Sequence, residues 1–155
     1  MLFVFFGDKM NELGMRIAHH KRRGEWAELR FLERAAEQGL CVSKPWGETL
    51  SYDVVVEASG RLLRVQVKST WSMNHGAYVL GIRNSRGAYP PGAFEVVAGY
   101  LIPLDVWYLL PECKVQGKAT ILLYPRIQSD QNTCPTAKLG NSSPAIPLPK
   151  SRHNR

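Results

Sequence analysis

The sequence predicts an α+β domain in which one N-terminal helix packs on a mixed, mostly antiparallel sheet. A single strong helical pattern lies near the N-terminus, a series of short strand patterns follows it, and little helical pattern comes afterwards. With 155 residues, of which 45 % are apolar, the chain is long enough to form one domain with a substantial core.

The helix is expected between Glu25 and Gln38, and Gly39 supplies a C-terminal stop. Apolar residues recur in this stretch at spacings of three and four and form one stripe: Trp26, Leu29, Leu32, Ala35 and Ala36. Glu28 precedes Leu29 by one position and Leu32 by four. We therefore expect Glu28 at the edge of the helix face that packs on the domain.

Strand patterns fill most of the remaining chain, at residues 40–44, 50–58, 61–70, 77–82, 96–102, 106–110 and 119–124. Ser59-Gly60 is a tight-turn signal, so residues 50–58 and 61–70 are expected to form an antiparallel hairpin. Side chains on the return strand alternate between two faces. One face carries Leu63, Val65 and Val67, and the other carries Arg64, Gln66 and Lys68.

The chain is expected to have three zones: a leader over residues 1–20, a folded domain over 21–125 and a polar, disordered tail over 126–155. The apolar run at residues 1–6 is too short to span a bilayer and lacks the features of a secretory signal, so no membrane association is expected. This run is either a short strand or a disordered end, unless the natural start is Met10 or Met15.

The charge balance favours a polyanionic partner, because 20 Lys and Arg residues stand against 13 Asp and Glu residues, a formal net charge of +7. Nucleic acid is the first candidate. Lys21, Arg22 and Arg23, ahead of the expected helix, and Arg64 on the hairpin are candidate phosphate contacts. The alternative is that these charges are only solvated surface.

Three scattered cysteines, Cys41, Cys113 and Cys134, match neither a zinc-binding spacing nor a disulfide framework. This pattern suits a reducing cytoplasm. Trp46 is expected to pack on the core, with stacking on a base as the alternative. Glu95 is expected to be a strand-end charge rather than part of a site.

Chemistry is indicated where Asp53, on the first hairpin strand, lies beside Gln66 and Lys68 on the second. Gln66 and Lys68 are two residues apart, so both side chains leave the same face and can converge with Asp53. Carboxylate and carbonyl-type oxygens suit Mg²⁺, and a nearby lysine can orient water or neutralise charge in phosphodiester cleavage. Glu28 would supply a second acid. The alternative is that Asp53 simply pairs with Lys68 or Arg64.

This pattern resembles the PD-(D/E)XK nuclease superfamily, and in particular a small bacterial endonuclease group similar to Holliday-junction resolvases and group I intron homing endonucleases. The likeness is carried by Asp53, by Gln66-Val67-Lys68-Ser69-Thr70 and by Gly24-Glu25-Trp26-Ala27-Glu28 ahead of a helix. It covers roughly residues 21–125.

The resemblance implies a restriction-endonuclease-like core and DNA cleavage with Mg²⁺, for which Mn²⁺ could substitute. Asp53, Gln66 and Glu28 would hold the metal, and Lys68 would complete the catalytic set. Tyr52 and Gln66 depart from the family pattern, since they replace the proline and the second acid. The DNA would be branched or site-specific, and a homodimer or homotetramer would allow two centres to cut two strands.

Two other functions remain open. A catalytically inactive nucleic-acid-binding module on the same fold is favoured by the neutral Gln66. A protein–protein interaction domain, with its charge serving solubility alone, ranks below both.

Overall fold

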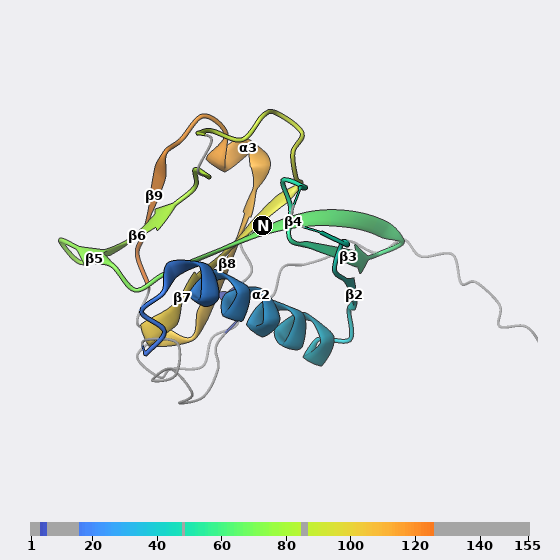
Figure 1. Cartoon of the computed structure of the whole chain (residues 1–155), viewed down its shortest axis with the longest axis horizontal. Coiled ribbons are helices and arrows are strands. Elements are labelled where there is room, and N and C mark those ends of the chain that lie inside the picture. Colours follow the sequence, from blue (N-terminus) through green and yellow to red (C-terminus); the bar gives the residue numbers. More distant parts are fainter. Residues whose placement is uncertain (1–3, 6–15, 48, 85–86, 126–155) are drawn as a thin grey trace, which may run out of the picture. The chain divides into compact units, whose positions relative to one another are not determined.

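The computed structural model describes residues 4–5, 16–47, 49–84 and 87–125, and after one short N-terminal strand its elements follow the predicted helix-then-strands order (Figure 1). The helical elements are α2 (His20–Glu37), the 3₁₀ turn η1 (Ile102–Leu104) and α3 (Glu112–Val115). The strands are β1 (Val4–Phe5), β2 (Cys41–Ser43), β3 (Val54–Ala58), β4 (Arg61–Thr70), β5 (Met73–Asn74), β6 (Ala77–Gly81), β7 (Val96–Leu101), β8 (Val106–Pro111) and β9 (Thr120–Leu123).

The main sheet has six strands in the order β1-β8-β7-β4-β3-β2. Strands β4 and β7 pair in parallel, with Gln66 opposite Val97 and Lys68 opposite Gly99. The other neighbours in this sheet pair antiparallel. The predicted class, one N-terminal helix on a mixed and mostly antiparallel sheet, is therefore confirmed.

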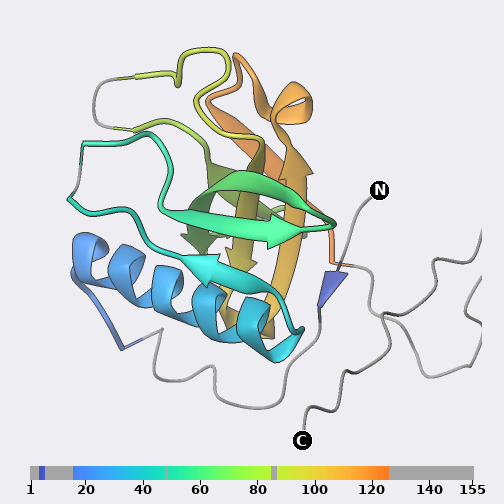
Figure 2. The ribbon, with the colours of Figure 1, turned by 90° about the vertical axis from the view of Figure 1, so that its right-hand side faces the viewer.

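A second sheet of three antiparallel strands, in the order β5-β6-β9, was not expected from the sequence. Its strands match the predicted patterns at residues 77–82 and 119–124, but they pair with each other instead of extending the main sheet. Figure 2 shows α2 along one face of the main sheet, with the second sheet and α3 toward the other face.

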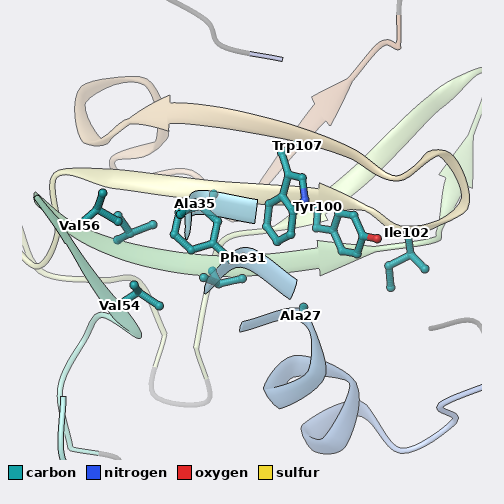
Figure 3. Packing of buried hydrophobic residues seen from close by; sticks show 11 residues of the cluster. Ala27, Phe31, Ala35, Val54, Val56, Tyr100, Ile102 and Trp107 are labelled. Carbon is teal, nitrogen blue, oxygen red and sulfur yellow. The ribbon is translucent and has the colours of Figure 1, made fainter. Parts of the chain in front are cut away.

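The hydrophobic core is divided between these two faces by the alternation along the strands. On the α2 side, Phe31 packs edge-on against Trp107 with ring centroids 5.3 Å apart, and Tyr100 stacks on Trp107 at 4.3 Å (Figure 3). Val65 and Val67 of β4 belong to this side. On the other side, Val97 and Leu101 of β7 pack with residues of β6 and β9.

The helix differs from its predicted form in two ways. It begins at His20, five residues before the predicted start at Glu25, so Lys21, Arg22 and Arg23 lie inside its first turn. Its buried line is Ala27, Phe31 and Ala35, whereas Leu29 of the predicted stripe is 61 % exposed. The spacing of apolar residues in the sequence fits both the predicted stripe and the observed buried line. The packing of Phe31 against Trp107 turns the observed line toward the sheet.

The β3–β4 hairpin has the predicted pairing, with Val54 opposite Val65 and Ala58 opposite Arg61. Ser59 and Gly60 both have positive φ, at 52° and 72°, as the predicted tight turn requires. The first strand is shorter than predicted, because it begins at Val54 rather than at residue 50.

The predicted leader and tail lie mostly outside the residues that the structure describes. Val4–Phe5 pairs antiparallel with β8, whereas residues 1–3 and 6–15 of the leader and the whole tail, 126–155, lie outside the described residues. Among the residues that are described, no helix is long and apolar enough to cross a membrane.

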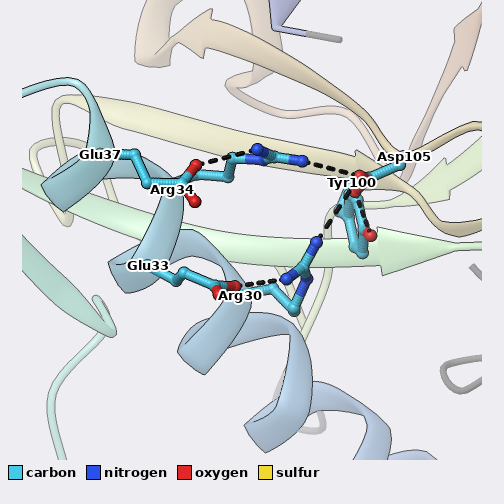
Figure 4. A network of polar contacts seen from close by, with 6 residues as sticks. All are labelled: Arg30, Glu33, Arg34, Glu37, Tyr100 and Asp105. Atoms are coloured by element: carbon cyan, nitrogen blue, oxygen red, sulfur yellow. Dashed lines mark hydrogen bonds and ion pairs between the residues drawn. The ribbon is translucent and has the colours of Figure 1, made fainter. Parts of the chain in front are cut away.

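An ion-pair network joins α2 to the turn between β7 and β8 (Figure 4). Asp105 is fully buried at 0 % exposure, and its Oδ2 lies 2.8 Å from an Nη of Arg34 and 3.5 Å from an Nη of Arg30. The hydroxyl of Tyr100 donates to Oδ1 of Asp105. This network ties the helix to the sheet, and no spacing pattern in the sequence indicates it.

Candidate functional site

The candidate site lies where β3 begins beside the longer β4. Asp53 immediately precedes β3, and its backbone N–H donates to the carbonyl of Val65 at 2.9 Å. Its Oδ2 accepts a hydrogen bond from the backbone N–H of Val67 at 2.8 Å. The carboxylate thus takes the N–H that a continuing strand would pair with, which explains why β3 starts one residue later than Asp53.

Gln66 is held against Asp53 in a buried position. Its side chain is only 6 % exposed, and Nε2 donates to Oδ2 of Asp53 and, at 3.3 Å, to the carbonyl of Val67. The amide nitrogen of Gln66 thus contacts both the carboxylate of Asp53 and the backbone carbonyl of Val67. Gln66 alternates with Val65 and Val67 along β4, and its side chain lines the same cleft as Glu28 of α2.

Lys68 shares the face of Gln66. Its Nζ lies 5.2 Å from the centroid of the Tyr89 ring, over the face of that ring. An aromatic face of this kind stabilises a cation and helps to fix its direction. The ammonium nevertheless acts on the site, because its positive charge lowers the pKa of Asp53.

Glu28 reaches the site from α2. It follows the buried Ala27, and its side chain is 18 % exposed. Its Oε2 lies 2.6 Å from Nζ of Lys44, just beyond the end of β2. The expected position at the edge of the packed helix face is the one observed.

The pKa of Asp53 is raised to about 6, mainly because burial disfavours the charged carboxylate. The negative charge of Glu28 raises this pKa further. The hydrogen bond from Val67 and the positive charges of Lys68 and Lys44 lower it. The carboxylates of Asp53 and Glu28 line the same cleft.

The four residues expected to form the site line one cleft of about 330 Å³: Glu28, Asp53, Gln66 and Lys68. His20 and Ser69, which were not among the expected site residues, also line it. His20, Gly24 and Glu28 are spaced by four along α2, so helical periodicity could have placed His20 on this face. Lys44 was also missed, and no spacing in the sequence points to it.

The basic residues predicted to contact DNA are arranged differently from one another. Lys21 lines a neighbouring cleft, and Arg22 is exposed in the first turn of α2. Arg23 lines the site cleft, lies 3.9 Å above the ring of Trp71, and donates to the carbonyl of Ile17 at 3.2 Å. Arg64 is paired with Glu95, which lowers the pKa of that carboxyl.

The donor set suits a hard divalent cation, although it is modest. In the part of the chain that the structure describes, no three His, Cys, Asp or Glu side chains cluster as metal ligands. Two carboxylates, from Asp53 and Glu28, and the amide of Gln66 line the same cleft. Oxygen donors of this type are those that Mg²⁺ and Mn²⁺ prefer.

A helix on a mixed sheet, with an acid at the start of one strand and an X-X-Lys pattern on the next, is the arrangement of a nuclease fold. Residues 18–138 match the family described as PD-(D/E)XK endonuclease. The chain belongs to this family.

A solved structure supports the same conclusion. The chain is similar to a bacterial homing endonuclease, I-Ssp6803I, with 31 % sequence identity and a TM-score of 0.62. The alignment covers 75 % of this chain and 85 % of that one. A search among curated protein sequences gives no match.

Proposed function

We propose that this protein is a metal-dependent DNA endonuclease that hydrolyses phosphodiester bonds, with its active centre at Asp53, Gln66, Lys68 and Glu28. The observation that supports this most strongly is their convergence on one cleft from α2, β4 and the residue before β3. The endonuclease family and its DNA substrate are consistent with that chemistry.

In this proposal Asp53, Glu28 and Gln66 hold a Mg²⁺ ion, for which Mn²⁺ can substitute. The ion would polarise the scissile phosphate and lower the pKa of a bound water. The carboxylates supply the negative charge that binds the ion. Gln66 contributes its amide oxygen, which a half-turn of the amide brings to the side where Nε2 now faces Asp53.

Lys68 is proposed to act on the reacting groups themselves. Gln66 and Lys68 leave the same face of β4, so the ammonium is directed toward the place where the phosphate would lie. A positive charge there stabilises the negative charge that develops on the phosphate in the transition state and orients the attacking water. Tyr89 restricts the directions open to the lysine.

Lys21, Arg22 and Arg23 are proposed to contact the DNA backbone from the first turn of α2. Arg64 remains a weaker candidate, because its guanidinium is already matched by Glu95. The DNA is proposed to be branched or site-specific, and a homodimer or homotetramer would place two centres on two strands. A cytoplasmic location is part of the same proposal.

The direct test is to incubate the purified protein with supercoiled, linear and four-way-junction DNA, with Mg²⁺, with Mn²⁺ and with EDTA. We expect metal-dependent nicking or cleavage. Lys68→Ala should abolish turnover while DNA binding in EDTA stays close to that of the wild type. Intact DNA in both metals, or equal losses of binding and turnover in the variant, would contradict the proposal.

A second candidate is a non-catalytic nucleic-acid-binding module on the same fold. It is favoured by one observation, the neutral Gln66 whose Nε2 donates to Asp53 where the family pattern has an acid. Titration calorimetry with Mg²⁺ separates the two. A metal site that is lost in Asp53→Ala supports the enzyme, whereas DNA binding without any metal site supports the module.

A further inference from the structure

Trp46 lies in the loop between β2 and β3 with its side chain 100 % exposed. The expectation that it packs on the core is therefore wrong. An indole has a large apolar surface with a polar N–H, and Trp is enriched at binding interfaces. The backbone favours this outward position, since Pro45 restricts the chain before Trp46 and Gly47 turns it with a φ of 85°.

The loop that carries Trp46 forms one wall of a cleft of about 670 Å³. The opposite wall belongs to the first turns of α2, where Lys21 contributes a positive charge. Lys44 and Tyr52 also line this cleft. The cleft thus combines an exposed aromatic ring with two ammonium groups and with the carboxylates of Glu25, Glu28 and Asp53. The ring and the ammonium groups are the kinds of side chain that contact the bases and backbone of an unpaired nucleic-acid strand.

This cleft is continuous with the candidate active site. Glu28, Asp53 and Gly24 line both clefts. A DNA strand whose scissile phosphate lies against Asp53 and Lys68 can therefore extend past Lys44 toward Trp46. The shared carboxylates place the aromatic ring within a short stretch of strand from the bond to be cut.

We infer that Trp46 stacks on a nucleobase of an unpaired or unstacked nucleotide next to the cleaved phosphate. The inference rests on the proposed function, because it places DNA in the active-site cleft. A base inside regular duplex has both faces covered by its neighbours, so the indole needs a base at a junction, a bulge or a kinked step. The cleft therefore selects for distorted DNA.

The test uses a labelled duplex with one unpaired thymine and the same duplex fully paired, both in EDTA so that no cleavage occurs. Binding is followed by fluorescence anisotropy of the label and by quenching of tryptophan emission. We expect Trp46→Ala to weaken binding of the bulged duplex by about ten-fold and Trp46→Phe to weaken it less, because stacking contributes about 1–3 kcal/mol per base. Quenching by the bulged DNA should be reduced in Trp46→Phe, because Trp46 no longer contributes to it.

Tyr124→Ala is the matched control, since it removes another exposed aromatic, just after β9, and should bind like the wild type. Equal binding by Trp46→Ala and the wild type, or quenching of Trp46→Phe as strong as that of the wild type, would overturn the inference. Binding and quenching without cleavage in metal would contradict only the proposed function. Cleavage by the wild type, with the binding and quenching of the Trp46 variants unchanged from the wild type, would contradict only the stacking. Failure of the wild type to bind either duplex would overturn both.

Discussion

Nζ of Lys44 lies 2.6 Å from Oε2 of Glu28, so a lysine from the end of β2 occupies a carboxylate proposed to bind the metal. The ion pair raises the pKa of Lys44, and the ammonium also lowers the pKa of Asp53. The ammonium of Lys44 is therefore ion-paired with Glu28 and also acts electrostatically on Asp53. A divalent ion must compete with this ammonium for Glu28.

Lys44→Met should tighten the binding of Mg²⁺ or Mn²⁺ several-fold. The substitution keeps the aliphatic stem but removes a positive charge that repels the ion and occupies Glu28. Isothermal titration calorimetry at low ionic strength measures the effect. Lys114→Met, at an exposed position of α3, controls for the loss of one net charge. Unchanged or weaker affinity in Lys44→Met would show that the ion pair positions Glu28 and does not compete with the metal.

Asp53→Asn should stabilise the metal-free protein at neutral pH. The pKa of Asp53 rises from its ordinary 3.8 to about 6 on folding, so the folded state holds a proton that the unfolded state has lost. As pH rises from about 4 to 6 the wild type loses stability from this group, and above 6 the full cost of the buried charge remains. Two pKa units correspond to roughly 3 kcal/mol, which is the upper limit of the gain.

Urea denaturation in EDTA at pH 4 and at pH 7.5 measures this effect. The advantage of Asp53→Asn should be small at pH 4 and should grow through the window between 4 and 6. The asparagine oxygen can still accept from Val67, so the fold is preserved. An advantage that does not depend on pH would mean that the gain has another source than the carboxylate charge.

Much of the fold could be predicted because the strands carry local alternation. The bounds of β4 match their prediction at Arg61 and Thr70, and the turn residues fix its pairing with β3. The second sheet could not be predicted, since β6 and β9 find each other across almost forty residues. Local patterns identify strands, whereas tertiary packing decides which strands pair.

The candidate site likewise contains residues that could be predicted from local patterns and one that depends on tertiary packing. Asp53, Gln66 and Lys68 could be brought together from the sequence, because a hairpin fixes their register. Glu28 followed from its place on the helix. Lys44 could not be found, since its contact with Glu28 depends on how the end of β2 lies against α2. The roles of these residues stay predictions until metal binding and cleavage are measured.

Gln66→Glu should make the protein more dependent on metal for its stability. Gln66 is buried, and its amide donates to Asp53, so a glutamate there puts two carboxylates side by side. Their repulsion should destabilise the protein in EDTA, and a divalent ion should recover the loss. Thermal unfolding with EDTA and with Mg²⁺ should therefore show a larger metal-induced rise in Tm than in the wild type.

The exposed Gln116→Glu is the control, since it adds the same charge away from the cleft. If Gln66→Glu gains no more stability from metal than Gln116→Glu does, the side chain at position 66 does not face the ion. The proposed metal site would then lose one of its three ligands.

Asp105→Ala should destabilise the protein by about 3–5 kcal/mol, the usual effect of removing one partner from a buried ion pair. Asp105 is fully buried, and Arg34, Arg30 and Tyr100 all direct polar atoms at it. Without the carboxylate these groups lose their common partner beneath α2. Asp105→Asn should cost less, because asparagine tolerates the left-handed φ of 50° and can still accept from Tyr100.

Glu33→Gln gives the comparison, since Glu33 pairs with Arg30 at the exposed end of the same network and is 53 % exposed. Its loss should change the free energy of unfolding by less than about 1 kcal/mol. Urea denaturation of the three variants measures the order Asp105→Ala, Asp105→Asn, Glu33→Gln. If Asp105→Ala left the free energy of unfolding unchanged, the apolar packing of Phe31 on Trp107 would be enough to hold α2 on the sheet without the buried charge. Glu28 also lies on α2. If Asp105→Ala strongly destabilises the protein, this variant should therefore bind the metal more weakly than Glu33→Gln does.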